Sequence, residues 1–327
     1  MSNPIPSQMH VSRPLTSISV AFTQSATDFI ALKAFPPVPV PNAYDQYFVY
    51  DLGDFTRDEM GERAPGTESV GAGYEITTES YACKPFALHK DVSEQDYAAA
   101  DTPLDPDRDA AEFLALKGLI KLEKLWHDSF FKTSVWSDDI EGVASGGETL
   151  GTSVVQWSDA TNATPVADIG YYSKLIRGKT GVTPNLLVLS PDVYFDLCQT
   201  DDVLNRIRYT QRATVTPELL AAVLGVNTVL VSGGVYNTAA QGATDSIGYI
   251  NTTDGALLMY SNPAPQRRRP SAGYTFFWDY GGVGPNGWVT SRYYMPSLKA
   301  NRIEIDASFD QKLVSAALGI YFTDLIA

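Results

Sequence analysis

This 327-residue chain has few of the residues on which catalytic and metal sites depend. It contains two cysteines, Cys83 and Cys198, and three histidines, His10, His89 and His127. Two cysteines are too few for a disulfide framework, and no two histidines have the spacing of metal ligands. The sequence also contains no Walker loop, no dinucleotide-binding glycine fingerprint and no nucleophile elbow. We therefore expect no catalytic residues, no cofactor and no metal.

Basic residues are scarce as well. The chain has 24 Lys and Arg against 38 Asp and Glu, which gives a formal charge of −14 and a pI near 4.6. Phosphate contacts need a positive field, so this balance excludes a sequence-reading or tight nonspecific DNA binder. It does not exclude a container for DNA. The compact basic cluster Arg267-Arg268-Arg269 is expected to contact an acidic surface of a neighbouring subunit, with nucleic-acid contact and a solvated loop as the alternatives.

Long apolar runs are missing too. No run approaches the ~20 residues needed to cross a bilayer, so no membrane contact is expected. The first residues, Met1-Ser2-Asn3-Pro4-Ile5-Pro6, have neither the basic start nor the apolar core of a signal peptide. With so few cysteines, the protein is expected to be made in a reducing cytoplasm.

The sequence does contain a Pro-rich apolar arm, Phe35-Pro36-Pro37-Val38-Pro39-Val40-Pro41. Its prolines hold the backbone extended and cannot donate hydrogen bonds to a sheet. We predict that residues 1–40 are an arm lying on a neighbouring subunit. Phe35, Val38 and Val40 would then be buried only after assembly. A loose tail is the alternative.

A long polar hairpin is predicted over residues 41–90. Aromatic and β-branched residues predict strands at 44–50 and 74–83, and the segment between them is rich in glycine and charge. A hairpin with so long and polar a tip is not stable alone, so we expect it to lie on a partner. The residues predicted to make intersubunit contacts there are Arg57, Glu59, Glu62 and Arg63.

One unusually long helix is predicted over residues 105–132. Asp105 is a good N-cap and Pro106 suits the first helical position. A wide apolar stripe at helical spacing runs from Phe113 to Phe130. At ~1.5 Å per residue the helix would be roughly 40 Å long. Such a helix would be a structural spine.

The remainder is predicted as a mixed region followed by a strand-like tail. Helical patterns alternate with buried strand runs such as Leu186-Leu187-Val188-Leu189 and Thr228-Val229-Leu230-Val231. This alternation predicts one α/β layer over residues 166–295. The tail is expected to pair with strands near the spine helix.

The order of these parts resembles that of tailed-bacteriophage major capsid proteins of the Hong Kong 97 fold. The resemblance covers nearly the whole chain and is a pattern, not a catalytic signature. Besides the helix from Asp105, the segments that carry it are Tyr47-Phe48-Val49-Tyr50-Asp51, Glu62-Arg63-Ala64-Pro65-Gly66, His89-Lys90-Asp91-Val92 and Asn185-Leu186-Leu187-Val188-Leu189-Ser190.

The resemblance implies an α+β fold with four parts. These are an N-arm (1–40), an E-loop hairpin (41–90), a P-domain with the spine helix (91–165, completed by 296–327) and an A-domain (166–295). It implies a structural protein that forms hexamers and pentamers and closes an icosahedral virion shell around double-stranded DNA. The expected partners are other copies of the chain, a portal and a separate scaffolding protein, with a decoration protein as a further option.

One departure from the family concerns covalent reinforcement. Some members join neighbouring subunits by a Lys–Asn isopeptide bond from the E-loop. This chain has no lysine between Lys33 and Lys84, so the loop tip lacks that donor. The resemblance therefore implies a shell held by non-covalent contacts.

Two other functions stay open at this point. One is an encapsulin-type compartment, a shell of the same fold that holds enzymes. The other is a carboxylate-dependent hydrolase, which would need two carboxylates converging in a cleft. The sequence spacing indicates no particular pair.

Overall fold

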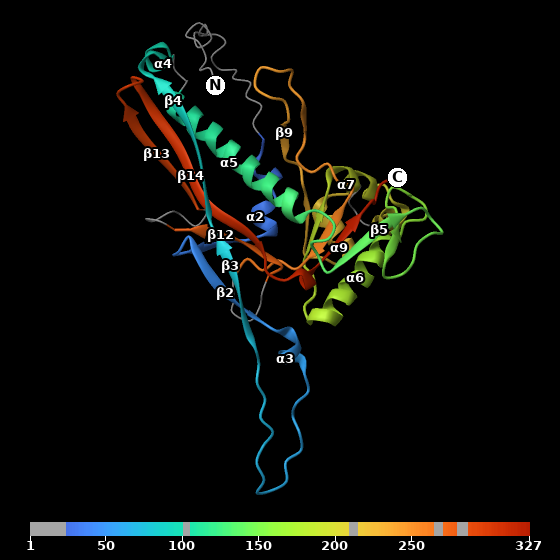
Figure 1. Ribbon diagram of the computed structural model, residues 1–327. Coiled ribbons are helices and arrows are strands. Elements are labelled where there is room, and N and C mark those ends of the chain that lie inside the picture. Colours follow the sequence, from blue (N-terminus) through green and yellow to red (C-terminus); the bar gives the residue numbers. More distant parts are fainter. Residues whose placement is uncertain (1–23, 101–104, 209–214, 265–270, 280–286) are drawn as a thin grey trace.

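The computed structural model describes residues 24–100, 105–208, 215–264, 271–279 and 287–327. An elongated body carries one long hairpin, which projects well beyond it (Figure 1). None of the described helices has the length and apolarity of a membrane span. The helices are η1 (Ala26–Asp28), α2 (Ala31–Ala34), α3 (Leu52–Thr56), α4 (Glu94–Ala99), α5 (Pro106–Phe130), α6 (Pro165–Thr180), α7 (Pro191–Leu197), α8 (Asp201–Ile207), α9 (Pro217–Leu224) and η2 (Ala316–Leu318).

The predicted spine helix is confirmed as α5. The Asp105 carboxylate accepts hydrogen bonds from the backbone N–H groups of residues 107 and 108 and so caps the helix. The buried face includes Leu114, Leu122 and Trp126, whereas Phe113, predicted to lie in the stripe, is 37% exposed. Gly118 allows a close approach, because a Cβ there would lie 2.7 Å from the Trp288 ring.

A five-stranded sheet lies against α5. Its strand β14 pairs with β4 on one side and with β13 and then β12 on the other, while β1 pairs with β12. Leu114 packs with Ile303 and Ile305 of β14 and Val92 of β4, so the helix and the sheet share a core. The strands are β1 (Pro37–Val40), β4 (Lys84–Ser93), β12 (Gly273–Trp278), β13 (Trp288–Met295) and β14 (Ala300–Leu313).

A six-stranded sheet forms the other half of the body, in the order β6-β5-β15-β11-β7-β8. Leu187 and Leu189 face a core with α6 to α9, and Leu186 and Val188 face the core that holds Trp126 of α5. Burial on both faces explains why these strands read as continuous apolar runs. The strands are β5 (Asp138–Val143), β6 (Ser153–Val155), β7 (Leu186–Leu189), β8 (Thr228–Val231), β11 (Ala256–Met259) and β15 (Gly319–Thr323).

The sheets do not follow the predicted domain limits, 91–165 with 296–327 and 166–295. β5, β6 and β15 belong to the six-stranded sheet, although they were expected in the P-domain. β12 and β13 belong to the five-stranded sheet, although they were expected in the A-domain. Period-two patterning reveals a strand but not the strand that it pairs with, so it did not predict which sheet each of these strands joins. The two strands of the tail therefore belong to different sheets. β14 lies beside α5, as predicted, whereas β15 lies in the six-stranded sheet.

Candidate assembly surfaces

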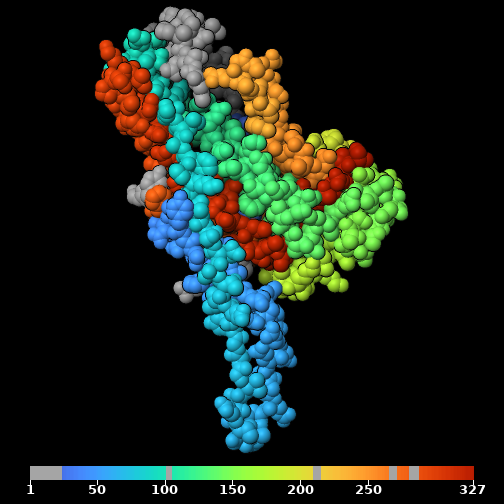
Figure 2. Space-filling model, in the orientation of Figure 1, coloured from blue at the N-terminus to red at the C-terminus, as the bar shows by residue number. Residues whose placement is uncertain are grey.

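The projecting hairpin is built on two paired strands, β2 (Tyr44–Tyr50) and β3 (Ile76–Ala82). They are antiparallel, with Tyr44 opposite Ala82 and Tyr50 opposite Ile76. Residues 51–75 extend past them as a narrow finger that stands clear of the body (Figure 2). Since a two-stranded hairpin is marginally stable in water, this segment needs a further surface to hold its position.

Local contacts shape the neck of the hairpin. The rings of Tyr50, Phe55 and Tyr74 lie 5.4 to 6.0 Å apart, and the Asp51 carboxylate caps α3. The backbone N–H of residue 75 donates to the Asp54 carboxylate at 2.9 Å. These contacts join the two sides of the hairpin at its neck, and nearly all residues of the tip beyond them are exposed.

The hairpin exposes large apolar side chains. Phe48 is 69% exposed, Met60 96% and Val70 69%. Apolar groups gathered on one projecting segment are typical of surfaces that are covered by a partner. The hairpin therefore has the composition of a contact surface, as well as the shape of one.

The predicted polar contacts of the tip divide into two kinds. Arg57 lies 3.5 Å from an Asp54 oxygen and 3.3 Å from a Glu59 oxygen, so its charge is partly compensated within its own loop. Glu62 and Arg63 are exposed, and neither forms an ion pair with another described residue. Contacts of all four predicted residues with a second subunit stay a prediction.

The Pro-rich arm lies on its own subunit. β1 is parallel to β12, with Val38 opposite Phe276 and Val40 opposite Trp278. The backbone N–H groups of residues 275 and 279 donate to the carbonyl oxygens of residues 36 and 40. The backbone hydrogen-bonding groups of the even-numbered residues of β1 thus point toward β12. Those of Pro37 and Pro39 point to the free edge of the sheet, where proline is tolerated because no N–H is needed.

The prediction that Phe35, Val38 and Val40 are buried only after assembly is wrong for two of the three. Phe35 is 0% exposed, with ring centroids 5.8 Å from Trp126 and 4.7 Å from Phe130. Val40 is 8% exposed, whereas Val38 is only partly buried. The chain supplies its own apolar groove because β12, far away in sequence, offers a free edge at this point. The basic cluster Arg267-Arg268-Arg269, which was also predicted to contact a neighbouring subunit, lies outside the described residues.

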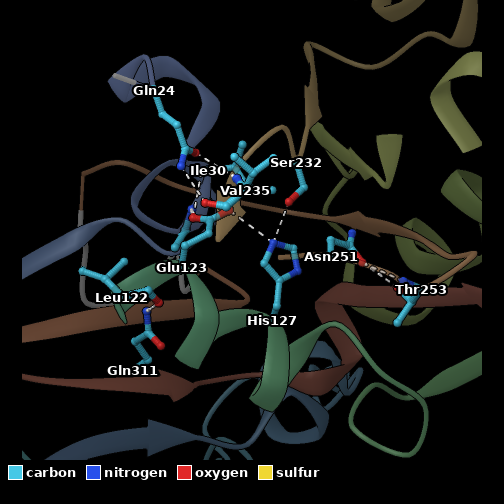
Figure 3. A network of polar contacts seen from close by, with 11 residues as sticks. Gln24, Ile30, Leu122, Glu123, His127, Ser232, Val235, Asn251, Thr253 and Gln311 are labelled. Carbon is cyan, nitrogen blue, oxygen red and sulfur yellow. Dashed lines mark hydrogen bonds and ion pairs between the residues drawn. The ribbon is translucent and has the colours of Figure 1, made fainter. Parts of the chain in front are cut away.

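A buried polar network fastens the start of this arm to the body (Figure 3). Glu123 of α5 is 0% exposed, and its Oε2 accepts from the backbone N–H groups of Ile30 at 2.9 Å and Ala31 at 2.7 Å. Its Oε1 lies 3.2 Å from His127 Nε2, which is also 2.8 Å from Ser232 Oγ. Three separate parts of the chain meet at this point, namely the arm, the spine helix and the segment after β8.

Ser232, His127 and Glu123 are the residue types of a catalytic triad, but their geometry differs from one. In a triad the serine and the acid use opposite ring nitrogens of the histidine. Here both contact Nε2, and Nδ1 has no partner among the described residues. The acid therefore does not orient the ring through its second nitrogen, as a triad requires. The network is therefore structural. Glu123 and His127, four residues apart within an apolar stripe, were the sequence signal for it.

Other titratable groups are shifted by burial. Burial raises the pKa of Asp168 to about 6, against hydrogen bonds from Trp157 and Thr164 that favour the charged form. Burial also raises the pKa of the Cys83 thiol to about 11 and that of Cys198 above its usual value. Neither thiol is thereby activated as a nucleophile. Within the described ranges, no three His, Cys, Asp or Glu side chains are grouped as a metal site would require.

Comparisons with known proteins identify the fold. No family model matches the chain. Among curated proteins, the major capsid protein of Burkholderia phage BcepMu is 26% identical over 131 residues. The matched region spans 40% of this chain and 43% of that protein, less than half of each.

Similarity to solved structures extends over nearly the whole chain. A phage-related protein from Bordetella bronchiseptica RB50 has a TM-score of 0.67 at 19% identity, covering 93% of this chain and 94% of that one. The capsid protein of cyanophage P-SCSP1u has a TM-score of 0.62 at 10% identity, with 99% and 95% covered. The SrpI encapsulin of Synechococcus elongatus PCC 7942 has 0.54 at 11% identity, with 96% and 95% covered. The chain has the Hong Kong 97 fold, an α+β architecture, as expected from its sequence.

Proposed function

We propose that this chain is the major capsid protein of a tailed bacteriophage and assembles with copies of itself into an icosahedral shell around double-stranded DNA. The observation that carries the proposal is the hairpin of residues 51–75, which exposes apolar side chains and projects clear of the body of its own subunit. On a Hong Kong 97 body, such a hairpin has its natural partner surface on a neighbouring copy. The curated relative, itself a major capsid protein, supports the same function.

Each part of the fold then has a role in the shell. The hairpin of β2 and β3 is the E-loop, α5 with the five-stranded sheet is the P-domain, and the six-stranded sheet with α6 to α9 is the A-domain. Hexamers and pentamers would form from head-to-tail contacts that close into rings. We assign the chain no enzymatic role. Virion localisation, a portal, synthesis in the bacterial cytoplasm and assembly on a separate scaffolding protein complete the proposal.

The experiment is direct. The full chain is purified and imaged by negative-stain electron microscopy beside a variant that lacks residues 56–71, the charged tip of the E-loop. We expect closed shells from the full chain and folded, unassembled subunits from the variant, with the folded state checked by circular dichroism. Normal shells from the deletion variant would contradict the role given to the E-loop. A full chain that stays monomeric would contradict the proposed function.

Covalent reinforcement is not part of the proposal. The tip contains no lysine, and of the two cysteines Cys83 is buried and Cys198 is only partly exposed, so neither an isopeptide bond from the tip nor a disulfide is expected to join subunits. Contacts repeated around every local axis would hold the shell instead. Shells boiled in denaturing detergent without reductant should give one band near 35.6 kDa. A ladder of larger bands would contradict this, and Lys84 would be the first donor to test.

An encapsulin-type compartment is the second candidate, because SrpI shares the fold over most of its length. Portal and terminase genes beside this one would decide for the phage, and an adjacent cargo enzyme for the compartment. A carboxylate-dependent hydrolase finds no support in the groove of about 600 Å³ between α2 and α9, where Glu218 is the single carboxylate among the lining residues. The mechanism requires a pair.

A further inference from the structure

The spine helix α5 runs beside β4 on one face of the body, and three lysines form a row there (Figure 2). The Lys90 and Lys117 ammonium groups lie 5.7 and 5.5 Å from the centroid of the Phe113 ring. One helical turn further along α5, the Lys121 ammonium lies 5.6 Å from the centroid of the Phe86 ring of β4. Cation–π attraction to these rings keeps the three charges together. We call the row the lysine stripe (Lys90, Lys117 and Lys121).

Acidic side chains of the same subunit do not neutralise the lysine stripe. Within the described residues, none of its three ammonium groups forms an ion pair. Two of the exposed acids of α5 already have cations, since Glu112 pairs with Arg108 at 2.9 Å and Asp128 pairs with Lys124 at 3.4 Å. The third, Asp109, lies in the first turn of the helix, about two turns before the stripe begins. The stripe is therefore a local positive field on a chain with a formal charge of −14.

The other face of the five-stranded sheet has the opposite sign. Ile303 and Ile305 of β14 face the core shared with α5, so the even-numbered residues of β14 face away from the helix. The charged residues of β4 and β14 on that side are four acids and two cations, which gives a formal charge of −2: Asp91, Glu304, Asp306, Asp310, Arg302 and Lys312. Two of the acids pair with the two cations, which leaves Glu304 and Asp306 without a cation among the described residues.

The helix and sheet layer therefore has one basic face and one acidic face. A DNA duplex carries one negative charge per ~1.7 Å of its axis, so it is attracted by the first face and repelled by the second. Lys117 and Lys121 are exposed and Lys90 is partly buried, so phosphates can reach the ammonium groups. The aromatic rings place these groups before contact, which reduces the side-chain freedom lost on binding.

We propose that the lysine stripe contacts the phosphate backbone of the DNA that the shell encloses. This inference rests on the proposed function and adds to it the surface that meets the DNA. Lysine binds phosphate as a point charge, and phosphate contacts carry no sequence information. Three charges on an acidic subunit bind DNA weakly. Because every copy in the shell presents the same stripe, the weak contacts add along the duplex.

DNA binding by free, full-length subunits tests the inference without requiring a shell. The probe is a short fluorescent DNA duplex of mixed sequence, and its anisotropy is followed as the salt concentration is raised. For the unmodified chain, the logarithm of the association constant should fall with the logarithm of salt concentration with a slope of about −2.7, because three phosphates are neutralised. Lys117→Gln/Lys121→Gln leaves one lysine of the stripe. Its slope should be about −0.9, and its affinity at low salt should be lower by on the order of tenfold or more.

Two matched variants separate the stripe from total charge. Lys117→Arg/Lys121→Arg keeps both charges and should bind the duplex like the unmodified chain. Lys132→Gln/Lys174→Gln removes the same charge at exposed lysines outside the stripe and should also bind like the unmodified chain. Thermal unfolding checks that each variant is folded. Shells of Lys117→Gln/Lys121→Gln should assemble normally but retain less of the duplex when they are formed in its presence.

The outcomes distinguish this inference from the proposed function. Equal affinity of the unmodified chain and Lys117→Gln/Lys121→Gln for the duplex, or no binding by either, would overturn the inference and leave the proposed function standing. Lost assembly of that variant with unchanged DNA affinity would assign the stripe to a subunit contact and overturn it. Tighter binding of poly-glutamate than of the duplex would assign the stripe to an acidic protein and also overturn it. Absence of shells from the unmodified chain would instead contradict the proposed function.

Discussion

The arm and the E-loop were both predicted to lie on neighbouring subunits, yet they behave differently in the structure. The arm ends in β1, which is hydrogen-bonded to β12 and anchored by the fully buried Phe35. The E-loop tip touches only itself, and Phe48 near its base is 69% exposed. A segment folds onto its own subunit when its apolar residues find a free strand edge within reach. A charged, glycine-rich segment finds none and projects.

The largest expected effect distinguishes the two phenylalanines. Phe35→Ala should lower the free energy of unfolding by about 3–5 kcal/mol, because it removes a ring packed against Trp126 and Phe130. Phe48→Ala should change it by no more than about 0.5 kcal/mol, since that ring is exposed. Urea unfolding of free subunits measures both values.

The yield of assembled shells tests the role of Phe48, whose replacement is expected to leave the stability of the subunit almost unchanged. Phe48→Ala subunits are expected to be stable but to assemble poorly, because an exposed ring of the E-loop has its partner on the next subunit. If both variants lost stability equally, the contrast between arm and E-loop would not hold.

The second expected effect concerns the attachment of the arm. Glu123→Ala should destabilise the subunit by about 3 kcal/mol or more, because it leaves the N–H groups of Ile30 and Ala31 buried without an acceptor and opens a cavity. Glu112→Ala on the same helix removes an exposed carboxylate paired with Arg108 and should cost less than about 1 kcal/mol. Limited proteolysis should then cut near residues 24–36 in the Glu123 variant. An uncut arm would show that the network is not its main attachment.

The smallest expected effect is a pH dependence within the body. The pKa of Asp168 is raised from 3.8 to about 6 in the folded protein, so its contribution to stability is full below pH 4 and is lost as the pH rises through 6. Asp168→Asn removes this dependence. The quantity to compare is the free energy of unfolding of the variant minus that of the unmodified chain. This difference should be about 1–2 kcal/mol larger at pH 8 than at pH 4. Equal differences at both pH values would contradict a raised pKa.

Local structure was largely predictable from the sequence. The capped helix α5, the strand of residues 44–50, the buried strand β7 and the partly buried strand β8 were found from spacing, capping and apolar runs. These features depend on nearby residues, which is why one sequence suffices to reveal them.

Pairing between distant segments was not predictable. Three examples are the pairing of β1 with β12, the placement of β15 in a different sheet from β14, and the hydrogen bond from the N–H of Ala31 in α2 to Glu123. Each depends on which strand edges and backbone groups the whole fold leaves free. The candidate site shows the same division. The sequence predicted the exposed, charged E-loop tip but not the packing of Phe35 against Trp126 and Phe130, which come from a different element.

Hydrogen–deuterium exchange, compared between free subunits and assembled shells, tests the central claim most directly. Backbone amides of residues 51–75 should exchange rapidly in free subunits and become protected in shells, because the E-loop gains its partner only on assembly. The amides of β1 and β12 should be protected in both states, since they are paired within the subunit. Residues 51–75 that exchange equally fast in both states would contradict the account.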